Sequence, residues 1–169
     1  MYSGSVELNI FLQEDQEVIL EILTDPSVAK TYMLPEFRQK EEAIPLFLRL
    51  MELSQQEDRY VRCIRLKGRA IGFLNDVEIK AGRIELGYVI HPAYQGQGHM
   101  TQALGLAIRE LHENGFSEVI CGAFEENPAS LRVMAKSGMQ KSDYTDTVEY
   151  RGRTHRCLYY TAIKENYDA

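Results

Sequence analysis

The 169-residue sequence has no tryptophan and only three cysteines and five prolines. Cys63, Cys121 and Cys157 are far apart and odd in number. This argues against a disulfide framework and favours buried free thiols in a reducing compartment. No basic residue precedes Lys30, and the longest apolar run, residues 43–48, is far too short to span a bilayer. From these absences we expect a cytoplasmic protein with no targeting segment and no membrane partner.

The signals for nucleic acid and for metal are also missing. The chain has 19 Lys and Arg against 25 Asp and Glu, a net charge of −6. A broad nucleic-acid surface needs a basic face, so we expect no nucleic-acid partner, whereas a cationic substrate is compatible with this charge. The four histidines (His91, His99, His112 and His155) show no HExxH or paired spacing. We therefore expect no metal.

The composition that remains is that of a globular protein. Hydrophobic residues make up 44% and charged residues 26%, and the length fits one domain over residues 1–169. Helical periodicity covers residues 14–23, 40–55, 98–112 and 127–137, and strand-like patterns cover residues 6–12, 59–67, 70–79, 83–91, 117–124, 146–150 and 154–163. Pro45 stands either in the first turn of its helix or at a kink.

The order of these segments predicts the fold class. The turn sequences KGR, KAG and RGR indicate hairpins. The step from residues 83–91 through a helix to residues 117–124 is a parallel crossover. We therefore predict an α/β (α+β) fold: a mixed, mostly antiparallel, twisted sheet of six to seven strands with helices on both faces.

Two glycines stand one residue apart in HPAYQGQGHM, directly before a helix. Gly96 and Gly98 would let backbone N–H groups point into one concavity at a helix N-terminus, where an anion is favoured. The simpler interpretation is a tight strand-to-helix turn. A dinucleotide-binding turn is disfavoured because its third glycine would fall at Thr101. The sequence has no GK[ST], which excludes a Walker loop.

Four motifs in order resemble a known family. They are residues 95–100 (QGQGHM), the segment Asn127-Pro-Ala-Ser130, the pair Gly138-Met139, and the closing RGRTHRCLYYTAI. The first corresponds to a Gln/Arg-x-x-Gly-x-Gly/Ala pattern, in which Met100 replaces the usual small residue. The chain resembles the GNAT superfamily of acyl-CoA N-acyltransferases, and within it the ribosomal-protein N-terminal acetyltransferases. This resemblance covers nearly the whole chain. It implies the GNAT-type sheet, acetyl-CoA as cosubstrate and an amine acceptor.

The resemblance also implies which residues hold acetyl-CoA. They are Val89, Ile90, Gln95, Gly96, Gln97, Gly98, His99, Met100, Thr101, Asn127 and Ser130. Residues 95–101 would cradle the diphosphate. The backbone of Val89 and Ile90 would pair with pantetheine, and one N–H there would stabilise the oxyanion. Each assignment has a structural alternative: core packing for Val89 and Ile90, and a helix N-cap for Asn127.

Glu85 is the best candidate for the general base. It precedes Val89 by four residues on one strand, so both side chains are expected on the same face. An amine nucleophile arrives largely protonated, and a group must accept that proton. The alternative is a solvated or ion-paired glutamate. Ser130 would support the departing thiolate. Met134 stands where some relatives carry a tyrosine regarded as the general acid, so that role cannot be carried over.

We therefore predict acetyl transfer from acetyl-CoA to a primary amine by direct attack in a ternary complex. The acceptor would be the N-terminal α-amine of a protein or peptide, or a small amine. The alternatives are a non-catalytic CoA-binding sensor or partner module and, more weakly, an oligomerisation domain; a homodimer stays open. The acceptor pocket is expected near residues 31–38 and the last hairpin, with Tyr32, Met33, Phe37 and Tyr144 as candidates.

Overall fold

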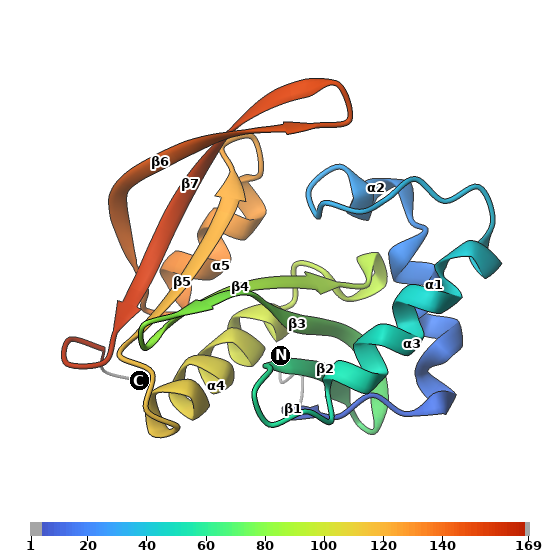
Figure 1. The fold of residues 1–169 in the computed structure, drawn as a ribbon, viewed down its shortest axis with the longest axis horizontal. Coiled ribbons are helices and arrows are strands. Elements are labelled where there is room, and N and C mark those ends of the chain that lie inside the picture. Colours follow the sequence, from blue (N-terminus) through green and yellow to red (C-terminus); the bar gives the residue numbers. More distant parts are fainter. Residues whose placement is uncertain (1–4, 168–169) are drawn as a thin grey trace. The chain divides into compact units, whose positions relative to one another are not determined.

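The computed structural model describes residues 5–167 and contains a seven-stranded sheet in the order β1-β2-β3-β4-β5-β7-β6 (Figure 1). The strands are β1 (Val6–Asn9), β2 (Val61–Leu66), β3 (Arg69–Lys80), β4 (Arg83–Ile90), β5 (Glu118–Phe124), β6 (Gln140–Tyr150) and β7 (Arg153–Ile163). The helices are α1 (Gln16–Leu23), α2 (Pro26–Ala29), α3 (Ile44–Leu53), α4 (His99–Glu113) and α5 (Pro128–Lys136). β4 and β5 are parallel, whereas β1–β2, β2–β3, β5–β7 and β6–β7 are antiparallel. The predicted mixed, mostly antiparallel sheet is confirmed.

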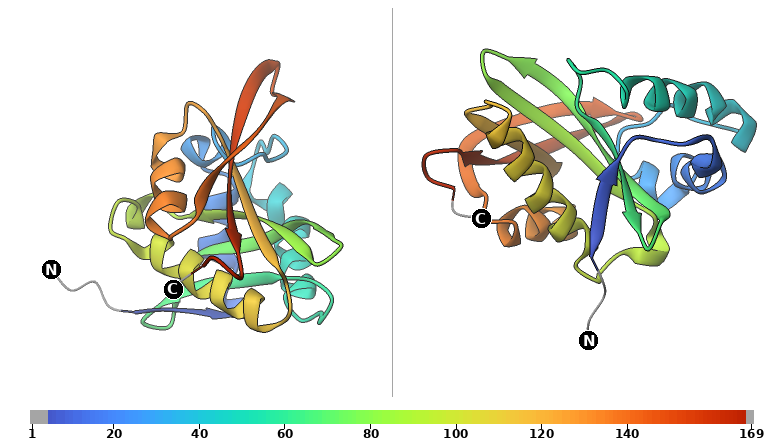
Figure 2. Two further views of the ribbon diagram at one scale, coloured as in Figure 1. Left: turned by 90° about the vertical axis from the view of Figure 1, so that its left-hand side faces the viewer. Right: turned by 90° about the horizontal axis from the view of Figure 1, so that it is seen from below.

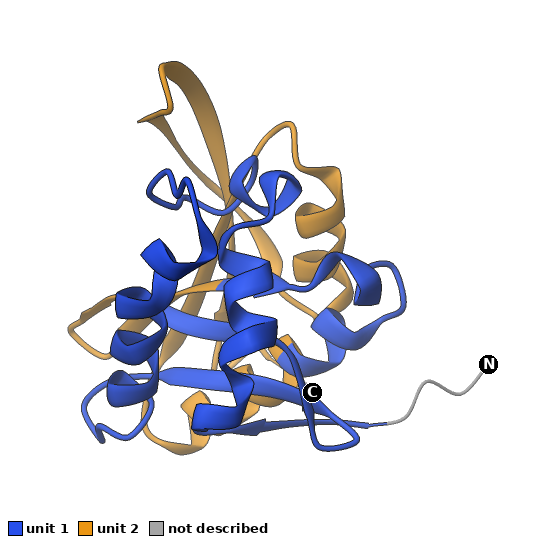
Figure 3. Cartoon of the chain, turned by 90° about the vertical axis from the view of Figure 1, so that its right-hand side faces the viewer, with its two compact units in different colours: residues 1–76, 88–103 blue, residues 77–87, 104–169 orange. Residues whose placement is uncertain are grey.

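The chain forms two compact units (Figure 3). Unit 1 comprises residues 1–76 and 88–103, and unit 2 comprises residues 77–87 and 104–169. β3 and β4 each contribute residues to both units, and each unit has its own buried residues. The expectation of a single domain over residues 1–169 stays a prediction.

The core of unit 1 is built around aromatic rings. Phe11 contacts Phe47 edge-on at 6.3 Å and Phe73 at 5.9 Å between ring centroids, and Tyr32 meets Phe73 edge-on at 5.7 Å. α1 and α3 supply aliphatic side chains to the same cluster. These rings bury large apolar areas, which is the main stabilising term for this unit.

In unit 2 one face of the sheet is buried and the other is partly open. The buried face carries Ile84, Leu86, Val119 and Cys121, none more than 1% exposed. α4 and α5 lie on one side of β5 and β7 (Figure 2). α4 buries Leu104, Ala107, Ile108 and Leu111, as its helical periodicity predicts.

The three predicted hairpin turns are confirmed. Each turn has two central residues with positive φ, of which the second is glycine: Lys67-Gly68, Ala81-Gly82 and Arg151-Gly152, with φ between 51° and 80°. Two positive φ angles are the signature of the type I′ turn that joins twisted antiparallel strands.

Several element boundaries differ from prediction. β1 ends at Asn9 rather than at residue 12, because Ile10 and Leu12 are 44% and 40% exposed and pair with no strand in residues 5–167. The short helix α2 was not predicted, although its N-cap Asp25 accepts hydrogen bonds from two backbone N–H groups. Pro45 lies in the first turn of α3 and not at a kink, so the first of its two predicted positions is confirmed. No helix in residues 5–167 is long and apolar enough to cross a membrane.

Candidate active site

The loop between β4 and α4 requires glycine at two positions. Gly96 and Gly98 have φ of +73° and +85°, values that residues with a Cβ rarely adopt. Nothing in the structure lies within 4 Å of a Cβ built at either residue. The glycines are therefore needed for backbone conformation and open space rather than for packing. Gln95 and Gln97 brace the loop through amide hydrogen bonds to the carbonyls of residues 90 and 93, at 3.4 and 3.1 Å.

The loop presents a row of unused donors. No acceptor among the described residues takes a hydrogen bond from the five backbone N–H groups of residues 96–100. Residues 95–98 are exposed, whereas the side chains of His99 and Met100 are buried. Free N–H groups and the macrodipole of the 15-residue α4 favour an anion at this end. Thr101 continues the first turn of α4.

Val89 and Ile90 are both 8% exposed, and Val89 belongs to the core of unit 1. Their core-packing role is thus observed. A Cβ at Gly72 on β3 would overlap the Val89 carbonyl oxygen, so β3 and β4 approach closely at this point. Sequence analysis did not single out Gly72.

Glu85 lies on the partly open face of unit 2. It pairs with Ile120 on β5, and Gly122 on the same strand pairs with Tyr159 on β7, so all four residues share one face. Burial, with Glu78 and Asp146 nearby, raises the pKa of Glu85 above its ordinary value. The Glu85 carboxylate makes no hydrogen bond or ion pair with any residue in 5–167. This environment disfavours the ion-paired alternative and is typical of a functional carboxylate.

Tyr159 is a neighbour of Glu85 that sequence analysis missed. A Cβ at Gly122 would stand 2.5 Å from Cε1 of Tyr159, so only glycine lets the ring lie against β5. The Tyr144 ring packs on Tyr159 at 5.3 Å between centroids. Burial raises the pKa of the Tyr159 hydroxyl, and the charge of Glu85 adds to this effect. The pairing across β5 that creates this arrangement has no local sequence signal.

Asn127 caps α5, as predicted. Its Oδ1 accepts a hydrogen bond from the Ser130 N–H at 3.3 Å, and Pro128 occupies the first helical position. Met134 is fully buried and serves as packing in this helix. Val89, Ile90 and the glycine loop belong to unit 1, whereas Glu85, Asn127 and Ser130 belong to unit 2.

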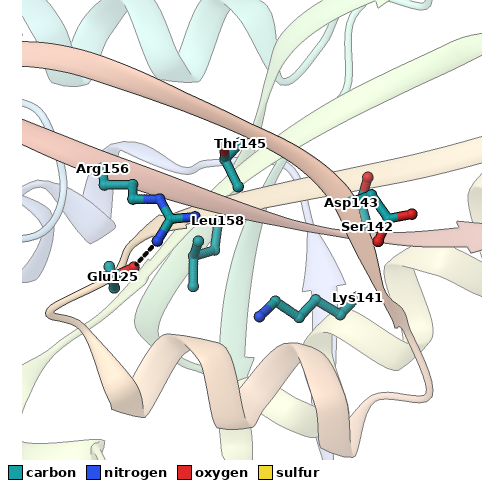
Figure 4. Close-up of a pocket in the computed structure, with 7 residues that line it drawn as sticks. All are labelled: Glu125, Lys141, Ser142, Asp143, Thr145, Arg156 and Leu158. Atoms are coloured by element: carbon teal, nitrogen blue, oxygen red, sulfur yellow. Dashed lines mark hydrogen bonds and ion pairs between the residues drawn. The ribbon is translucent and has the colours of Figure 1, made fainter.

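Two cavities lie within single units. One of about 340 Å³ in unit 1 contains three of the predicted acceptor-pocket residues. It is lined by Leu23, Tyr32, Met33, Leu34, Pro35, Phe37, Glu42, Pro45, Leu46, Leu50 and Phe73. Tyr144, the fourth candidate, packs on Tyr159 in unit 2 instead. The other cavity, of about 350 Å³, lies in unit 2 (Figure 4).

Within residues 5–167, no three His, Cys, Asp or Glu side chains are grouped as a metal ion requires, and the three cysteines are free and buried.

Comparisons with known proteins find similar sequences and solved structures with the same fold. The family model described as an acetyltransferase (GNAT) domain matches residues 6–140. A curated relative, the uncharacterised N-acetyltransferase p20 of Bacillus licheniformis, is 23% identical over 99% of this chain and 97% of its own. Two solved structures have the same fold with a TM-score of 0.82. One is the ribosomal L7/L12 α-N-protein acetyltransferase RimL with coenzyme A, 20% identical over 95% of each chain. The other is the microcin C7 self-immunity acetyltransferase MccE with acetyl-CoA and AMP, 16% identical over 96% and 97%.

Proposed function

Because the chain belongs to the acetyltransferase (GNAT) domain family and is an acetyl-CoA-dependent N-acetyltransferase, we propose that it acetylates a primary amine by direct attack in a ternary complex. The first acceptor class is the N-terminal α-amine of a protein or peptide. The observation that carries this proposal is the environment of Glu85: a half-buried carboxylate with a raised pKa and no partner among the described residues.

Glu85 acts as the general base. An α-amine has a pKa of about 8 and a lysine-type amine of about 10.4, so both arrive protonated at neutral pH. Glu85 takes one proton from the ammonium, directly or through water, and the freed nitrogen attacks the thioester carbonyl. The C–S bond then breaks, and the attacking nitrogen gives up a second proton as it becomes an amide. CoA leaves as a thiolate, which takes up this second proton. A raised pKa makes Glu85 a better proton acceptor than an ordinary surface carboxylate.

The glycine loop holds the diphosphate of acetyl-CoA. Its five free N–H groups at the start of α4 offer the donors, and the helix macrodipole favours the negative charge. The backbone of Val89 and Ile90 serves pantetheine, Asn127 contacts the cosubstrate, and Ser130 supports the departing thiolate. Each of these roles is inferred from the family resemblance.

The acceptor class rests on resemblance rather than on electrostatics. The net charge of −6 attracts cationic peptides, polyamines and aminoglycosides alike. Of the two matched enzymes described above, one modifies a protein α-amine and the other confers immunity to a microcin. The free, buried cysteines support the expected cytoplasmic location, since reducing compartments keep thiols unpaired.

An acceptor screen tests the proposal. Release of free CoA is followed with short peptides of varied first residue, with spermidine, with aminoglycosides and with single amino acids. We expect turnover of peptides that disappears when their N-terminus is blocked. Turnover confined to polyamines or antibiotics would refute the α-amine class. Acetyl-CoA binding without turnover of any acceptor would favour the non-catalytic CoA-binding module.

The role of Glu85 is tested with a matched pair of variants. Glu85→Gln removes the base and is expected to lower kcat by roughly 10² or more, with a smaller defect at high pH, where the amine deprotonates unaided. Glu78→Gln removes a neighbouring carboxylate that raises the pKa of Glu85. It should retain activity and move the acidic limb of the pH profile to lower pH. Wild-type kcat for Glu85→Gln across pH 6 to 9 would place the base elsewhere.

A further inference from the structure

The turn from β5 to α5, residues 125–127, is held by β7 on both faces of the sheet. The Glu125 N–H donates to the Arg156 carbonyl oxygen at 2.8 Å. The Arg156 guanidinium donates to the Glu125 carboxylate at 2.7 Å (Figure 4). The next carboxylate, that of Glu126, is bonded to Nδ1 of His155. Because consecutive strand residues point to opposite faces, His155 and Arg156 hold consecutive turn residues from the two sides of the strand.

The His155 side of this double contact is buried and closely packed. The histidine is 7% exposed, and its ring stacks on Phe124 with 4.1 Å between centroids and 13° between planes. Tyr150 packs against both rings at 6.1 Å. The hydrogen bond from His155 holds the pKa of Glu126 below its ordinary value, so the bond is charge-assisted at neutral pH. The Arg156–Glu125 pair is about half exposed and complements it.

Asn127 is the next residue of the turn, with φ −112° and ψ 74°, and it caps α5 through Ser130. We propose that His155 and Arg156 are positioning residues for acetyl-CoA: they hold residues 125–127 so that Asn127 is in place before the cosubstrate binds. This inference rests on the proposed function, which assigns Asn127 to acetyl-CoA. A turn ordered in advance lowers the entropic cost of binding.

Two substitutions of one residue separate positioning from packing. His155→Leu and His155→Asn both lose the stacking on Phe124, but only asparagine keeps an N–H donor close to the position of Nδ1. We expect His155→Leu to raise the Kd and the KM of acetyl-CoA about three- to fivefold, the scale of a partly exposed charged pair. His155→Asn should stay near wild type, and kcat at saturating acetyl-CoA should change little in either. Kd is measured by titration calorimetry, and melting temperature is recorded for each variant.

A second pair keeps the test valid if His155→Leu fails to fold. Glu126→Ala removes the same bond from its exposed partner and should raise the acetyl-CoA Kd similarly. Glu149→Ala removes an exposed carboxylate of the same hairpin, one that accepts from the Thr154 hydroxyl, and should bind as wild type. Equal weakening in His155→Leu and His155→Asn, or wild-type binding by Glu126→Ala, would overturn the inference. A wild-type protein that binds no acetyl-CoA would instead contradict the proposed function on which the inference depends.

Discussion

Replacing Gly98 by alanine should weaken acetyl-CoA binding without harming the fold. Gly98 has φ +85°, and nothing lies within 4 Å of a Cβ built there, so the methyl group meets no steric obstacle. The cost is conformational. A residue with a Cβ in the left-handed region loses about 1–2 kcal/mol. The free loop can avoid this cost by changing shape, but it must regain the original shape to present its N–H groups to a diphosphate.

The expected size of the effect follows from linkage. If the variant loop must return to the left-handed conformation on binding, the conformational cost of about 1–2 kcal/mol raises Kd about 5- to 30-fold. At an acetyl-CoA concentration 100 times the wild-type Kd, the wild-type fold gains about 2.7 kcal/mol, whereas a tenfold weaker variant gains about 1.4 kcal/mol. For a chain of this length each kcal/mol shifts the melting temperature about 2–4 °C. The acetyl-CoA shift should therefore fall from about 5–11 °C to about 3–6 °C.

Gly105→Ala provides the matched control. Gly105 lies inside α4, with open space around a methyl group placed on its Cα and no positive φ. Alanine there should raise the stability of the free protein by about 0.4–1 kcal/mol and leave the acetyl-CoA shift unchanged. The assay is a thermal-shift titration with acetyl-CoA, and calorimetry supplies Kd. Equal acetyl-CoA shifts for the Gly98 and Gly105 variants would refute the assignment of the loop to the diphosphate.

Three further predictions concern stability. Burial raises the pKa of Glu85, so its ionised form destabilises the fold as pH rises through that value. Glu85→Gln should therefore be more stable than wild type at pH 7 and equal to it below the ordinary glutamate pKa. Urea unfolding measures this, and an unchanged free energy of unfolding at pH 7 would contradict the raised pKa. Gly72→Ala should cost about 1–3 kcal/mol, because its methyl group overlaps the Val89 carbonyl, and an unchanged urea midpoint would argue against the close approach. Asp15→Asn should cost about 3–5 kcal/mol, because it removes the negative charge that faces the buried Arg65 guanidinium and leaves one oxygen in place of the two that accept its bonds of 2.6 and 2.7 Å. The melting temperature measures this cost, and a fall of less than about 6 °C would contradict it.

Local chemistry explains which parts of the fold could be predicted from the sequence. The turns at Gly68, Gly82 and Gly152 need two residues with positive φ, and an X-Gly pair between strands is a direct signal for that conformation. The helix α4 shows its buried face through spacing alone. The Asn127 cap and the glycine loop likewise consist of neighbouring residues. The features that were predicted correctly are ones whose deciding residues lie within a few positions of one another, although the short helix α2, capped locally by Asp25, was missed.

The catalytic assignment depends on contacts that no local pattern shows. The sequence left Glu85 open between a base and a solvated or ion-paired residue. The features that favour a base are its burial, the absence of a partner within residues 5–167, and the charges of Glu78 and Asp146. Asp146 reaches this face only because β6 pairs with β7 and β7 pairs with β5. The raised pKa of Glu85 therefore depends on the order of the strands in the sheet and not on the sequence around Glu85.

The irregularity in β6 shows the same limit at a single point. Lys141 pairs with Tyr160 and Thr145 with Leu158, so residues 142–144 stand opposite Tyr159 alone. The segment SDY contains no glycine or proline, and the strand was expected to begin only at residue 146. Two extra residues bend a strand outward, and this bend both sets the Tyr144 ring on Tyr159 and opens the cavity lined by Ser142 and Asp143. Because Tyr159 is held against β5 by the absence of a side chain at Gly122, the face that carries Glu85 is shaped by the combined geometry of three strands.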